Sequence, residues 1–351
     1  MAPNPFLGVF LHAVGGLAAG SFYIPFKRVK GWAWESYWIV GGFFSWIIVP
    51  LVLAFLICPD LVGVMKGSPS RSLLLTYIFG LLWGLGGLTF GLSMRYLGLS
   101  LGYALTLGFC AVFGTIIPPL FTGAAADLIG RLSGQVTLLG IIICLAGMVV
   151  AANAGRSKES ELSTEAKKAA IQEFNFAKGL WVAVFSGVMS ACMALAFWKG
   201  APIAETAVRF GMPPLFKNLP VLVIALAGGF TTNMLWCLGL NIKNHSFGDY
   251  FKRDRAPLIR NYIFSALAGT IWYFQFFFYS MGTTKMGKYD FSSWTIHMAF
   301  IIVFSNLWGL YFREWKGTSR RTHWLIVAGI LVLVASTLVV GAGNYIASLK
   351  K

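Results

Sequence analysis

Residues 138–155 read LLGIIICLAGMVVAANAG, a run of apolar and small side chains without a charged residue. About 18 consecutive apolar residues are enough for an α-helix to cross the hydrocarbon core of a bilayer. A second run of the same character, VAGILVLVASTLVVGAGN, occupies residues 327–344. The two runs share a Gly-Ile pair near the start and a Val-Val pair near the end. Together they predict a helical membrane protein.

The composition of the whole chain agrees with this prediction. Of the 351 residues, 57% are hydrophobic and only 11% are charged, whereas a soluble domain carries roughly 25% charged residues. Long apolar runs recur along the chain, and the short polar loops between them hold nearly all of the charge. A water-soluble globular protein is therefore excluded, and the lipid bilayer is expected to surround most of the surface.

Ten membrane-spanning helices are expected, with no soluble catalytic domain between them. The first apolar stretch is too long for a signal-peptide core and has no basic leader, so it is expected to remain as the first helix. The longest connection, residues 153–178, mixes Lys and Glu and has room for a short surface helix. The predicted spans are 6–26, 35–57, 72–94, 99–121, 135–152, 179–197, 214–240, 258–281, 291–312 and 323–346.

The predicted fold class is an all-α integral membrane protein built as a five-plus-five inverted repeat. An odd number of spans per half places the second half in the opposite orientation, which is the usual basis of alternating access in transporters. We expect a first repeat at 1–153, a cytoplasmic linker at 154–178 and a second repeat at 179–351. A weak internal similarity aligns Gly16, Ala19, Ser21 and Phe26 at a constant spacing with Gly187, Ser190, Cys192 and Phe197.

The formal net charge of +16 is explained by membrane orientation. The basic residues stand in loops and form no contiguous element for reading a nucleic-acid groove, so no nucleic-acid partner is expected. Loops rich in Lys and Arg stay cytoplasmic. Alternate loops on one side hold 18 of these residues and the opposite side holds 10. Both termini are therefore expected in the periplasm.

Sequence motifs of enzymes are absent. The chain has no GxxxxGK[ST] phosphate loop, no HExxH and no GxSxG, so ATP hydrolysis and membrane proteolysis or ester hydrolysis are not expected. The cysteines are scattered, without a CxxC pair or a histidine at ligand spacing, and are expected to be packing residues (Cys58, Cys110, Cys144, Cys192 and Cys237). We therefore expect a protein that is not an enzyme and has no metal or cofactor.

Several pairs of glycines are spaced four residues apart, a pattern that lets helix backbones approach closely in a membrane. We expect them to act in packing. They are Gly16 with Gly20, Gly80 with Gly84, Gly87 with Gly91, and Gly98 with Gly102.

Ionisable residues within the spans are few, and each is a candidate functional residue because charge is costly to bury in lipid. Asp290, Trp294 and His297 share one face of the ninth span at i, i+4 and i+7. A histidine that titrates near physiological pH suits proton coupling beside a hydroxylated ligand. In the alternative interpretation, Asp290 caps the helix N-terminus and Trp294 belongs to the interfacial aromatic belt.

His12 is the second candidate for proton coupling. It lies about two turns into the first span, on a stripe of small residues and one tyrosine that can border a cavity (Gly15, Gly16, Ala19 and Tyr23). The alternative is a neutral histidine that is hydrogen-bonded to a neighbouring helix.

The eighth span contains a candidate sugar platform. Residues 272–280 read WYFQFFFYS, in which Trp272, Gln275 and Tyr279 share one face. Aromatic faces can stack on the C–H groups of a sugar ring, and an amide can pair with its hydroxyl groups. Asn233 is another amide within a span, and a ligand contact competes there with a structural interhelical hydrogen bond.

Charged residues at the ends of the spans are candidates for gates. Lys27, Arg28 and Glu35 cluster between the first two spans, where an ion pair could close the cytoplasmic mouth in one state. The basic pair is equally explained by snorkelling to lipid headgroups. Glu205 occupies the matching outer mouth under the inverted repeat.

Several motifs, in order along the chain, carry a family resemblance. They are HAVGGLAAGSFYIPFKRVKGWAWESYW at 12–38, GLSMRYLGLSLG at 91–102, EFNFAKGL at 173–180, WYFQFFFYSMGTTKMGKYDFSSWTIHMAF at 272–300, and Glu314 with Trp315. The chain resembles the L-rhamnose–proton symporter family of the drug/metabolite transporter superfamily. Departures lie mostly in RFGMPPLFKNLP at 209–220 and ALTLGFCAVFGT at 104–115.

The resemblance implies a bacterial inner-membrane symporter that takes up L-rhamnose, or a related 6-deoxy sugar, with protons. An exporter or facilitator for another small polar solute is the alternative, and a membrane sensor or structural subunit is less favoured. From the residues themselves we expect substrate binding at Trp272, Gln275, Tyr279, Trp294, Asn233 and Tyr23. We expect proton coupling at His297, Asp290 and His12, and gating at Lys27, Glu35 and Glu205. The family match falls on all of these residues except Tyr279, and also on Pro25, Trp34 and Arg95, but it assigns no individual role.

Overall fold

The computed structural model describes residues 3–97, 99–122, 125–161, 176–251, 257–313 and 315–349. Within these ranges all regular secondary structure is helical, which confirms the prediction of an all-α protein. Most of the predicted linker, residues 162–175, lies outside the described residues. Among the described residues, eight stretches are long and apolar enough to cross a membrane: Pro5–Phe26, Trp34–Ile57, Ser70–Ser93, Leu132–Lys158, Ala177–Arg209, Pro214–Lys243, Leu258–Tyr311 and Arg320–Leu349.

The helices begin and end within several residues of the predicted spans, because hydrophobicity and chain length fix where a helix can lie in a bilayer. The N-terminal part contains α1 (Pro5–Ser21), α2 (Tyr23–Phe26), α3 (Trp34–Phe43), the π-helical turn η1 (Phe44–Ile48), α4 (Val49–Ile57), α5 (Leu61–Gly67), α6 (Ser70–Leu97), α7 (Leu99–Thr122), α8 (Ala125–Gly130) and α9 (Leu132–Ser160).

The C-terminal part continues with a similar sequence of long helices and short connecting turns. It contains α11 (Phe176–Lys199), α12 (Ala201–Arg209), η2 (Pro214–Phe216), α13 (Leu219–Lys243), η3 (Ser246–Tyr250), α14 (Leu258–Met286), η4 (Gly287–Ser292), α15 (Ser293–Tyr311) and α16 (Arg320–Leu349).

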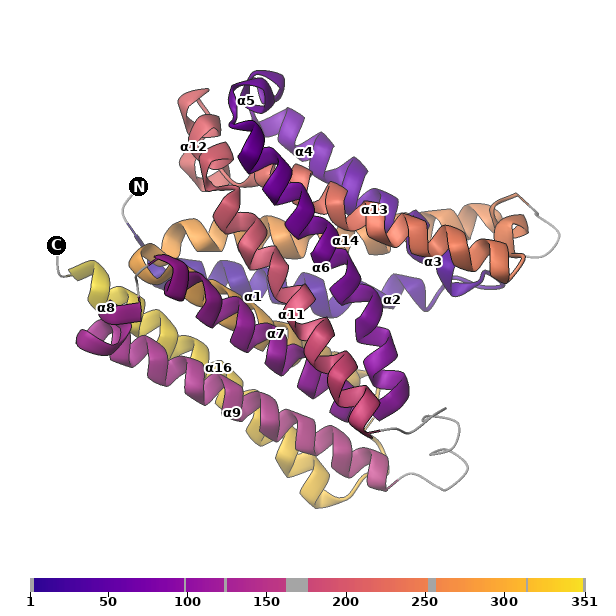
Figure 1. Ribbon diagram of the computed structural model, residues 1–351. Helices are drawn as coiled ribbons and strands as arrows, with labels where there is room; N and C mark the ends of the chain where they lie inside the picture. Colours follow the sequence, from indigo (N-terminus) through magenta and orange to yellow (C-terminus); the bar gives the residue numbers. More distant parts are fainter. Residues whose placement is uncertain are drawn as a thin grey trace.

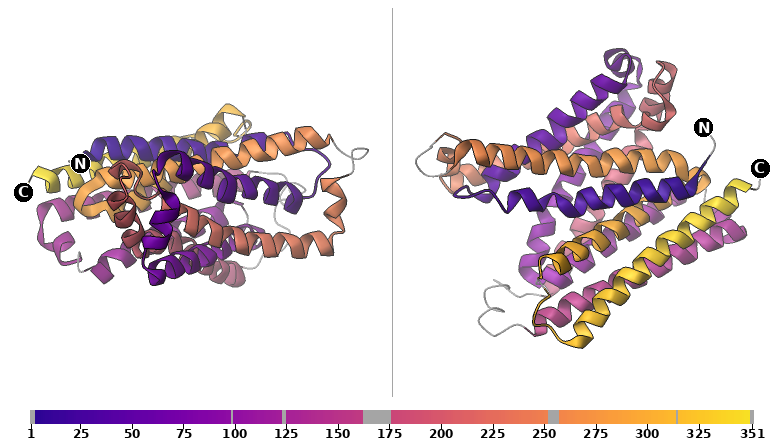
Figure 2. Two further views of the ribbon diagram at one scale, coloured as in Figure 1. Left: turned by 90° about the horizontal axis from the view of Figure 1, so that it is seen from above. Right: turned by 180° about the vertical axis from the view of Figure 1, so that it is seen from behind.

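The two parts of the chain interlock instead of forming separate bundles. The first helix of each part packs into the other part, so that α1 contacts α14 and α15, whereas α11 contacts α6 and α7. The last long helices, α9 and α16, run side by side along one edge (Figure 1). Figure 2 shows α1 running alongside α14 when seen from behind. Both chain ends lie at the same end of the molecule (Figure 1).

Glycines allow helix backbones to touch where the two parts cross. A Cβ atom on Gly80 of α6 would lie 2.0 Å from the carbonyl oxygen of Ala225 on α13. A Cβ atom on Gly269 of α14 would likewise lie 2.0 Å from the carbonyl oxygen of Gly41 on α3. No side chain larger than hydrogen fits at either position, because real Cβ atoms do not approach other atoms so closely.

The predicted glycine pairs differ in what they contact. Gly16 and Gly20 face the backbone of α15, and Gly80 and Gly84 face that of α13, so their packing role is confirmed. For Gly87 and Gly91 the packing prediction is wrong, since an added Cβ atom would meet none of the described residues within 4 Å. Gly98 lies outside the described residues, and the surroundings of Gly102 are not described. The packing prediction for this pair therefore stays a prediction.

A carboxylate joins the ends of α9 and α16. Glu161 accepts hydrogen bonds from the Ser319 N–H at 2.5 Å, the Ser319 hydroxyl at 2.6 Å and the Thr322 hydroxyl at 2.5 Å. These hydrogen bonds lower the pKa of Glu161 to about 2. Because they lie at the start of α16, the carboxylate also occupies the helix end that favours negative charge.

The glycine crossing predicts opposite effects of one substitution at two positions of α6. Gly80→Ala should lower the melting temperature of the purified protein, because the new methyl group overlaps the Ala225 carbonyl and overpacking costs roughly 1–3 kcal/mol or more. Gly87→Ala is the matched control, because it adds the same group where space is free and should be neutral or stabilising by up to about 1 kcal/mol. Equal melting temperatures for the two variants would contradict the crossing.

Candidate functional site

Two histidines from different helices meet in the interior of the protein. His12 of α1 and His297 of α15 are fully buried, and their ring centroids lie 6.3 Å apart. The ring of Tyr279 on α14 lies 5.3 Å from that of His12 and 5.1 Å from that of His297. The sequence predictions for these three residues therefore converge on one place, which we call the histidine cluster.

The imidazole nitrogens of the histidine cluster are not satisfied by the part of the chain that the structure describes. None of the four has a hydrogen-bond partner among the described residues. Buried polar side chains are normally hydrogen-bonded, and exceptions in native structures call for an explanation such as a functional role or a bound water or ion. The cluster can therefore accept or release a proton, or bind a polar group that enters from outside.

Two glycines provide the space for the imidazole rings. A Cβ atom on Gly282 of α14 would lie 2.7 Å from Cε1 and 2.8 Å from Nε2 of His12. A Cβ atom on Gly15 would lie 2.8 Å from the Gln275 carbonyl oxygen and 3.3 Å from Cε1 of His297. Sequence reasoning placed Gly15 on the same stripe as His12, but it missed Gly282, which gave no signal among the many glycines of the chain.

Trp294 forms a wall of the cluster and is held by the backbone. Its indole N–H donates a hydrogen bond to the carbonyl of Cys110 on α7, at 3.1 Å. Its ring meets that of Tyr279 edge-on at 5.6 Å. Since the only polar atom of the indole is bonded to the backbone, Trp294 offers a ring surface to the interior and no free donor.

Asp290 lies apart from the helical stripe that the sequence predicted. It is part of η4, where the backbone of Tyr289 is not helical, and α15 begins only at Ser293. The stripe on α15 therefore starts at Trp294, one turn after Asp290. The Asp290 side chain is exposed, whereas Trp294 and His297 are buried.

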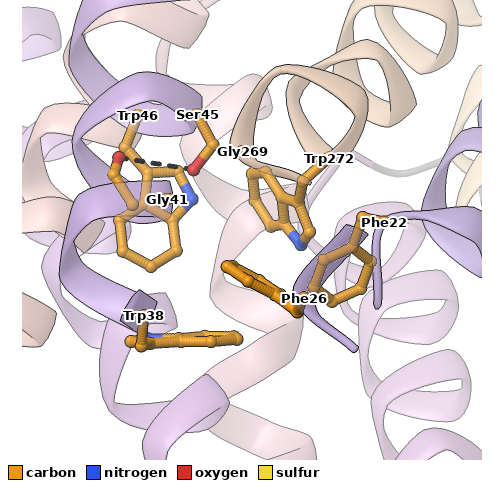
Figure 3. A pocket seen from close by; sticks show the side chains of 9 residues that line it. Phe22, Phe26, Trp38, Gly41, Ser45, Trp46, Gly269 and Trp272 are labelled. Atoms are coloured by element: carbon orange, nitrogen blue, oxygen red, sulfur yellow. Dashed lines mark hydrogen bonds between the residues drawn. The ribbon is translucent and has the colours of Figure 1, made fainter. Parts of the chain in front are cut away.

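An aromatic pocket lies between α3, η1 and α14 (Figure 3). About 210 Å³ of non-atom space lies within its bounds, including space that is open to the outside. The room inside the pocket is that of about one water molecule. Trp46 and Trp272 pack edge to face at its side, with ring centroids 5.6 Å apart and planes at 88°. The residues that line the pocket are Phe22, Phe26, Trp38, Gly41, Gly42, Ser45, Trp46, Gly269 and Trp272.

A π-helical turn places two of these lining residues. Ser45 and Trp46 belong to η1, which interrupts the second predicted span. Pro50 explains the interruption, because it lacks the N–H that would bond to the carbonyl of Trp46 in a continuous α-helix. π-Helical turns occur frequently at functional sites. Sequence reasoning missed Trp46, and Pro50 inside an apolar span was the signal that could have indicated it.

The predicted sugar platform is divided between the pocket and the histidine cluster. Trp272 lines the pocket, whereas Tyr279 belongs to the histidine cluster. Phe276 connects them, with its ring centroid 5.3 Å from Trp272 and 6.2 Å from His297. Gln275, between them along α14, is buried. The aromatic surface is therefore continuous from the pocket to the histidines.

Asn233 supports the pocket from behind. Its side-chain oxygen accepts a hydrogen bond from the Trp38 indole N–H at 3.1 Å, and its amide nitrogen donates to the Gly229 carbonyl at 2.9 Å. Tyr23 lies at the edge of the same aromatic group, 6.4 Å from the Trp38 ring, and is about half exposed. Asn233 thus forms the interhelical bond that the sequence left as one of two possibilities.

The candidate gate residues do not come together. The Lys27 ammonium lies over the ring of Phe312, 4.7 Å from its centroid. Glu35 is buried, and its carboxylate accepts hydrogen bonds from Asn244 at 2.9 Å and Ser246 at 2.6 Å. Glu205 is exposed on α12. Glu35 therefore connects α3 to the segment after α13, and no described ion pair joins it to Lys27.

Long apolar helices around unpaired titratable groups and an aromatic pocket are the features of a polytopic membrane protein that carries solutes. The chain belongs to the L-rhamnose-proton symport protein family, whose model matches residues 1–346. It is similar to the L-rhamnose-proton symporter of Cronobacter sakazakii, with 37% identity over 96% of this chain and 97% of that protein. The L-rhamnose-proton symporter of Mannheimia succiniciproducens is also 37% identical, over 98% and 99% of the two chains.

The fit of His12 against Gly282 makes one substitution informative. Gly282→Ala should displace the His12 ring and lower the transport rate severalfold, while the melting temperature changes little because a side chain can move more easily than a backbone. Uptake of radiolabelled L-rhamnose and thermal melting measure the two effects. Gly239→Ala, at a position of α13 with no described atom within 4 Å of the added group, is the control. Unchanged transport in Gly282→Ala would show that the position of His12 does not matter.

Proposed function

We propose that this protein takes up L-rhamnose, or a closely related 6-deoxy sugar, together with protons. The observation that carries the proposal is the histidine cluster, whose unsatisfied nitrogens lie next to a continuous aromatic surface. Such a site offers a titratable group and a stacking surface within a few ångströms of each other. Relatives that match nearly the full length of the chain are named L-rhamnose-proton symporters.

His12 and His297 are proposed to hold the proton. A histidine changes its charge near physiological pH, so it can load and release a proton within a transport cycle. A charged imidazole in a low-dielectric interior is more stable next to a polar group than next to apolar side chains. A sugar hydroxyl that binds beside the cluster therefore favours the protonated form, and this preference links the two fluxes. Asp290, exposed at the start of the α15 segment, is proposed to exchange protons with water.

The sugar is proposed to lie along the face of α14 that joins the pocket to the histidine cluster. Trp272 and Tyr279 supply ring surfaces, and the buried Gln275 supplies an amide between them. Trp294 closes the far wall, because its indole N–H is bonded to the Cys110 carbonyl. In this arrangement Asn233 and Tyr23 contribute through Trp38 and the pocket edge.

We propose that gates close the cytoplasmic and the outer mouth of the transport path. The gate residues are Glu35, Lys27 and Glu205, of which Glu35 is the main one. Its hydrogen bonds to Asn244 and Ser246 connect α3 to the end of α13. Opening of this mouth would break these bonds and expose a carboxylate to water, which stabilises its charge. Lys27 and Glu205, which we assign to opposite mouths, have exposed side chains.

Ten spanning helices are proposed, two more than the eight apolar stretches. The stretch Leu258–Tyr311 covers two helices, α14 and α15, on either side of η4. Gly287, with a φ of 77°, ends α14 and lets the chain reverse its direction. Helix α7 supplies the remaining span, with 24 residues. Chain ends on the same side of the molecule (Figure 1) agree with an even number of crossings.

The pairing of the helices supports an inverted repeat. Gly16 of α1 packs on Phe300 of α15, and Gly187 of α11 packs on Phe109 of α7, each with an added Cβ atom 2.4 Å from the phenylalanine Cβ atom. The backbone contacts at Gly80 and Gly269 form a second matched pair, at 2.0 Å each. We propose repeats at 1–153 and 179–351, with the linker 154–178 between them.

The proposed repeat is chemically asymmetric. His12 stands four residues before Gly16, and the matching residue before Gly187 is Ala183. His297 stands three residues before Phe300, and the matching residue before Phe109 is Thr106. Thr106 is paired with the Ser93 hydroxyl at 2.9 Å. Proton binding is therefore assigned to one side of the pseudo-symmetric pair only.

We propose that both termini are periplasmic in the bacterial inner membrane, as the distribution of basic residues indicates. A cysteine introduced at the exposed Lys66 should react with a membrane-impermeant maleimide in intact cells. A cysteine at the exposed Ser160 should react only after permeabilisation. The reverse pattern would contradict the proposed orientation. The native cysteines are buried and should contribute little background.

Coupling is tested by His297→Gln, which keeps a hydrogen-bonding side chain but cannot carry the proton. Accumulation of L-rhamnose driven by an imposed proton gradient should fall toward equal concentrations on the two sides, whereas exchange without a gradient should persist. Uptake and exchange in vesicles measure the two modes. His323→Gln is the control, because His323 is exposed at the start of α16.

Two other results would change the assignment. If His297→Gln loses both modes equally, His297 is a sugar ligand or a structural residue. If the wild-type protein moves L-rhamnose at a rate that a protonophore does not alter, the protein is a facilitator and not a symporter.

A further inference from the structure

The aromatic pocket contains indole N–H groups that none of the described residues engages. The Trp38 indole N–H is bonded to Asn233, and the Ser45 hydroxyl donates to the Gly42 carbonyl at 3.3 Å. The indole nitrogen of Trp46 has no partner among the described residues, and Trp46 is only 4% exposed. The indole N–H of Trp272, which also lines the pocket, forms no hydrogen bond with the described residues either. The pocket is therefore an apolar cage with two free indole donors.

The shape of the pocket is fixed by the backbone rather than by mobile side chains. Gly41 and Gly269 bring α3 and α14 into backbone contact at its edge, and η1 directs Trp46 toward Trp272 (Figure 3). A π-helical turn is less favourable than a continuous helix, and such turns are found mostly where a side chain serves a function. The position of Trp46 in a π-helical turn and its unpaired indole N–H therefore both indicate that a ligand binds here.

The size and chemistry of the pocket fit part of a ligand. The pocket has room for about one water-sized group, whereas sites that enclose a whole small molecule span roughly 300–1,000 Å³. A cage of aromatic rings accepts a methyl group without a desolvation cost, whereas a hydroxyl group there would lose its hydrogen bonds to water. A 6-deoxyhexose carries a methyl group at one end, where the corresponding hexose carries a hydroxymethyl group.

We propose that the aromatic pocket binds the methyl end of the sugar and selects 6-deoxyhexoses over hexoses, with the Trp46 N–H donating to a neighbouring sugar oxygen. The proposal rests on the proposed sugar transport. The hydroxyl-bearing side of the sugar then points along α14 toward Gln275 and the histidine cluster. Specificity and proton coupling are in this way assigned to opposite ends of one continuous surface.

The test compares L-rhamnose with L-mannose, which has the same ring configuration and a hydroxyl group on C6. Competition of each sugar against radiolabelled L-rhamnose on the purified protein gives two affinities and their ratio. The wild-type protein should prefer L-rhamnose by about tenfold or more, since a buried hydroxyl group without a partner costs roughly 1–3 kcal/mol.

Two variants should reduce this preference. Trp46→Phe removes the donor and enlarges the cage, so L-rhamnose should bind about fivefold to tenfold more weakly while L-mannose loses less. Ser45→Ala leaves the fold intact and frees the Gly42 carbonyl to accept a hydrogen bond from the C6 hydroxyl. It should improve the binding of L-mannose relative to that of L-rhamnose.

Comparison variants separate the pocket from the rest of the site. Gln275→Met should weaken both sugars by a similar factor and preserve the ratio, because the amide is assigned to hydroxyl groups that they share. Trp324→Phe, at an exposed position of α16, should change nothing. Thermal melting establishes that each variant is folded.

The outcomes distinguish the pocket assignment from the transport assignment. If folded Trp46→Phe and Ser45→Ala retain the wild-type ratio, the pocket does not read the methyl group and the inference is overturned. If the wild-type protein binds neither sugar, the proposed function itself fails. If it binds L-rhamnose and L-mannose equally well, rhamnose transport survives and the selectivity inference does not.

Discussion

Direct contact between helix backbones is the constraint on which the rest of this structure depends. In a bilayer the hydrophobic effect does not drive helices together, so association relies on close packing and hydrogen bonds. At Gly80 and Gly269 the helices of the two parts of the chain touch through carbonyl oxygens. Trp272 follows Gly269 by less than one turn of α14, so the crossing also fixes where one wall of the aromatic pocket stands. Packing and site geometry are consequently set by the same residues.

The distribution of satisfied and unsatisfied polar groups divides the interior into structural and functional parts. Asn233, Glu35 and Trp294 all have defined partners, and each connects two segments that are far apart in the sequence. The imidazole nitrogens of His12 and His297 have none among the described residues. An unpaired polar group in the interior costs free energy, and its persistence at two neighbouring places points to ligands that come and go.

The spans could be predicted from the sequence because hydrophobic length decides them, and the histidines stood out because ionisable residues are rare in lipid. Other features depended on tertiary contacts. Glu35 looked like a partner of the adjacent Lys27, but its partners, Asn244 and Ser246, come from about two hundred residues further along the chain. The continuous stripe from Asp290 failed because Asp290 lies in the 3₁₀ turn η4 and α15 begins only at Ser293. Trp46 was hidden because a π-helical turn changes which face a residue occupies.

The histidine pair is present on only one side of the pseudo-symmetric scaffold. This limits how much sugar accumulation the membrane potential can drive. Two positive charges on neighbouring imidazoles repel each other in a low-dielectric interior, so the pair holds one proton far more readily than two. A carrier that moves one proton with each neutral sugar gains about 2.3 kcal/mol per 100 mV of membrane potential. Since 1.4 kcal/mol corresponds to a factor of ten in concentration, each 100 mV sets a ceiling of roughly fiftyfold on sugar accumulation. Histidines at the positions of Ala183 and Thr106 would add a second such pair. If a second proton then moved with each sugar, the highest concentration ratio that a given membrane potential can support would be squared.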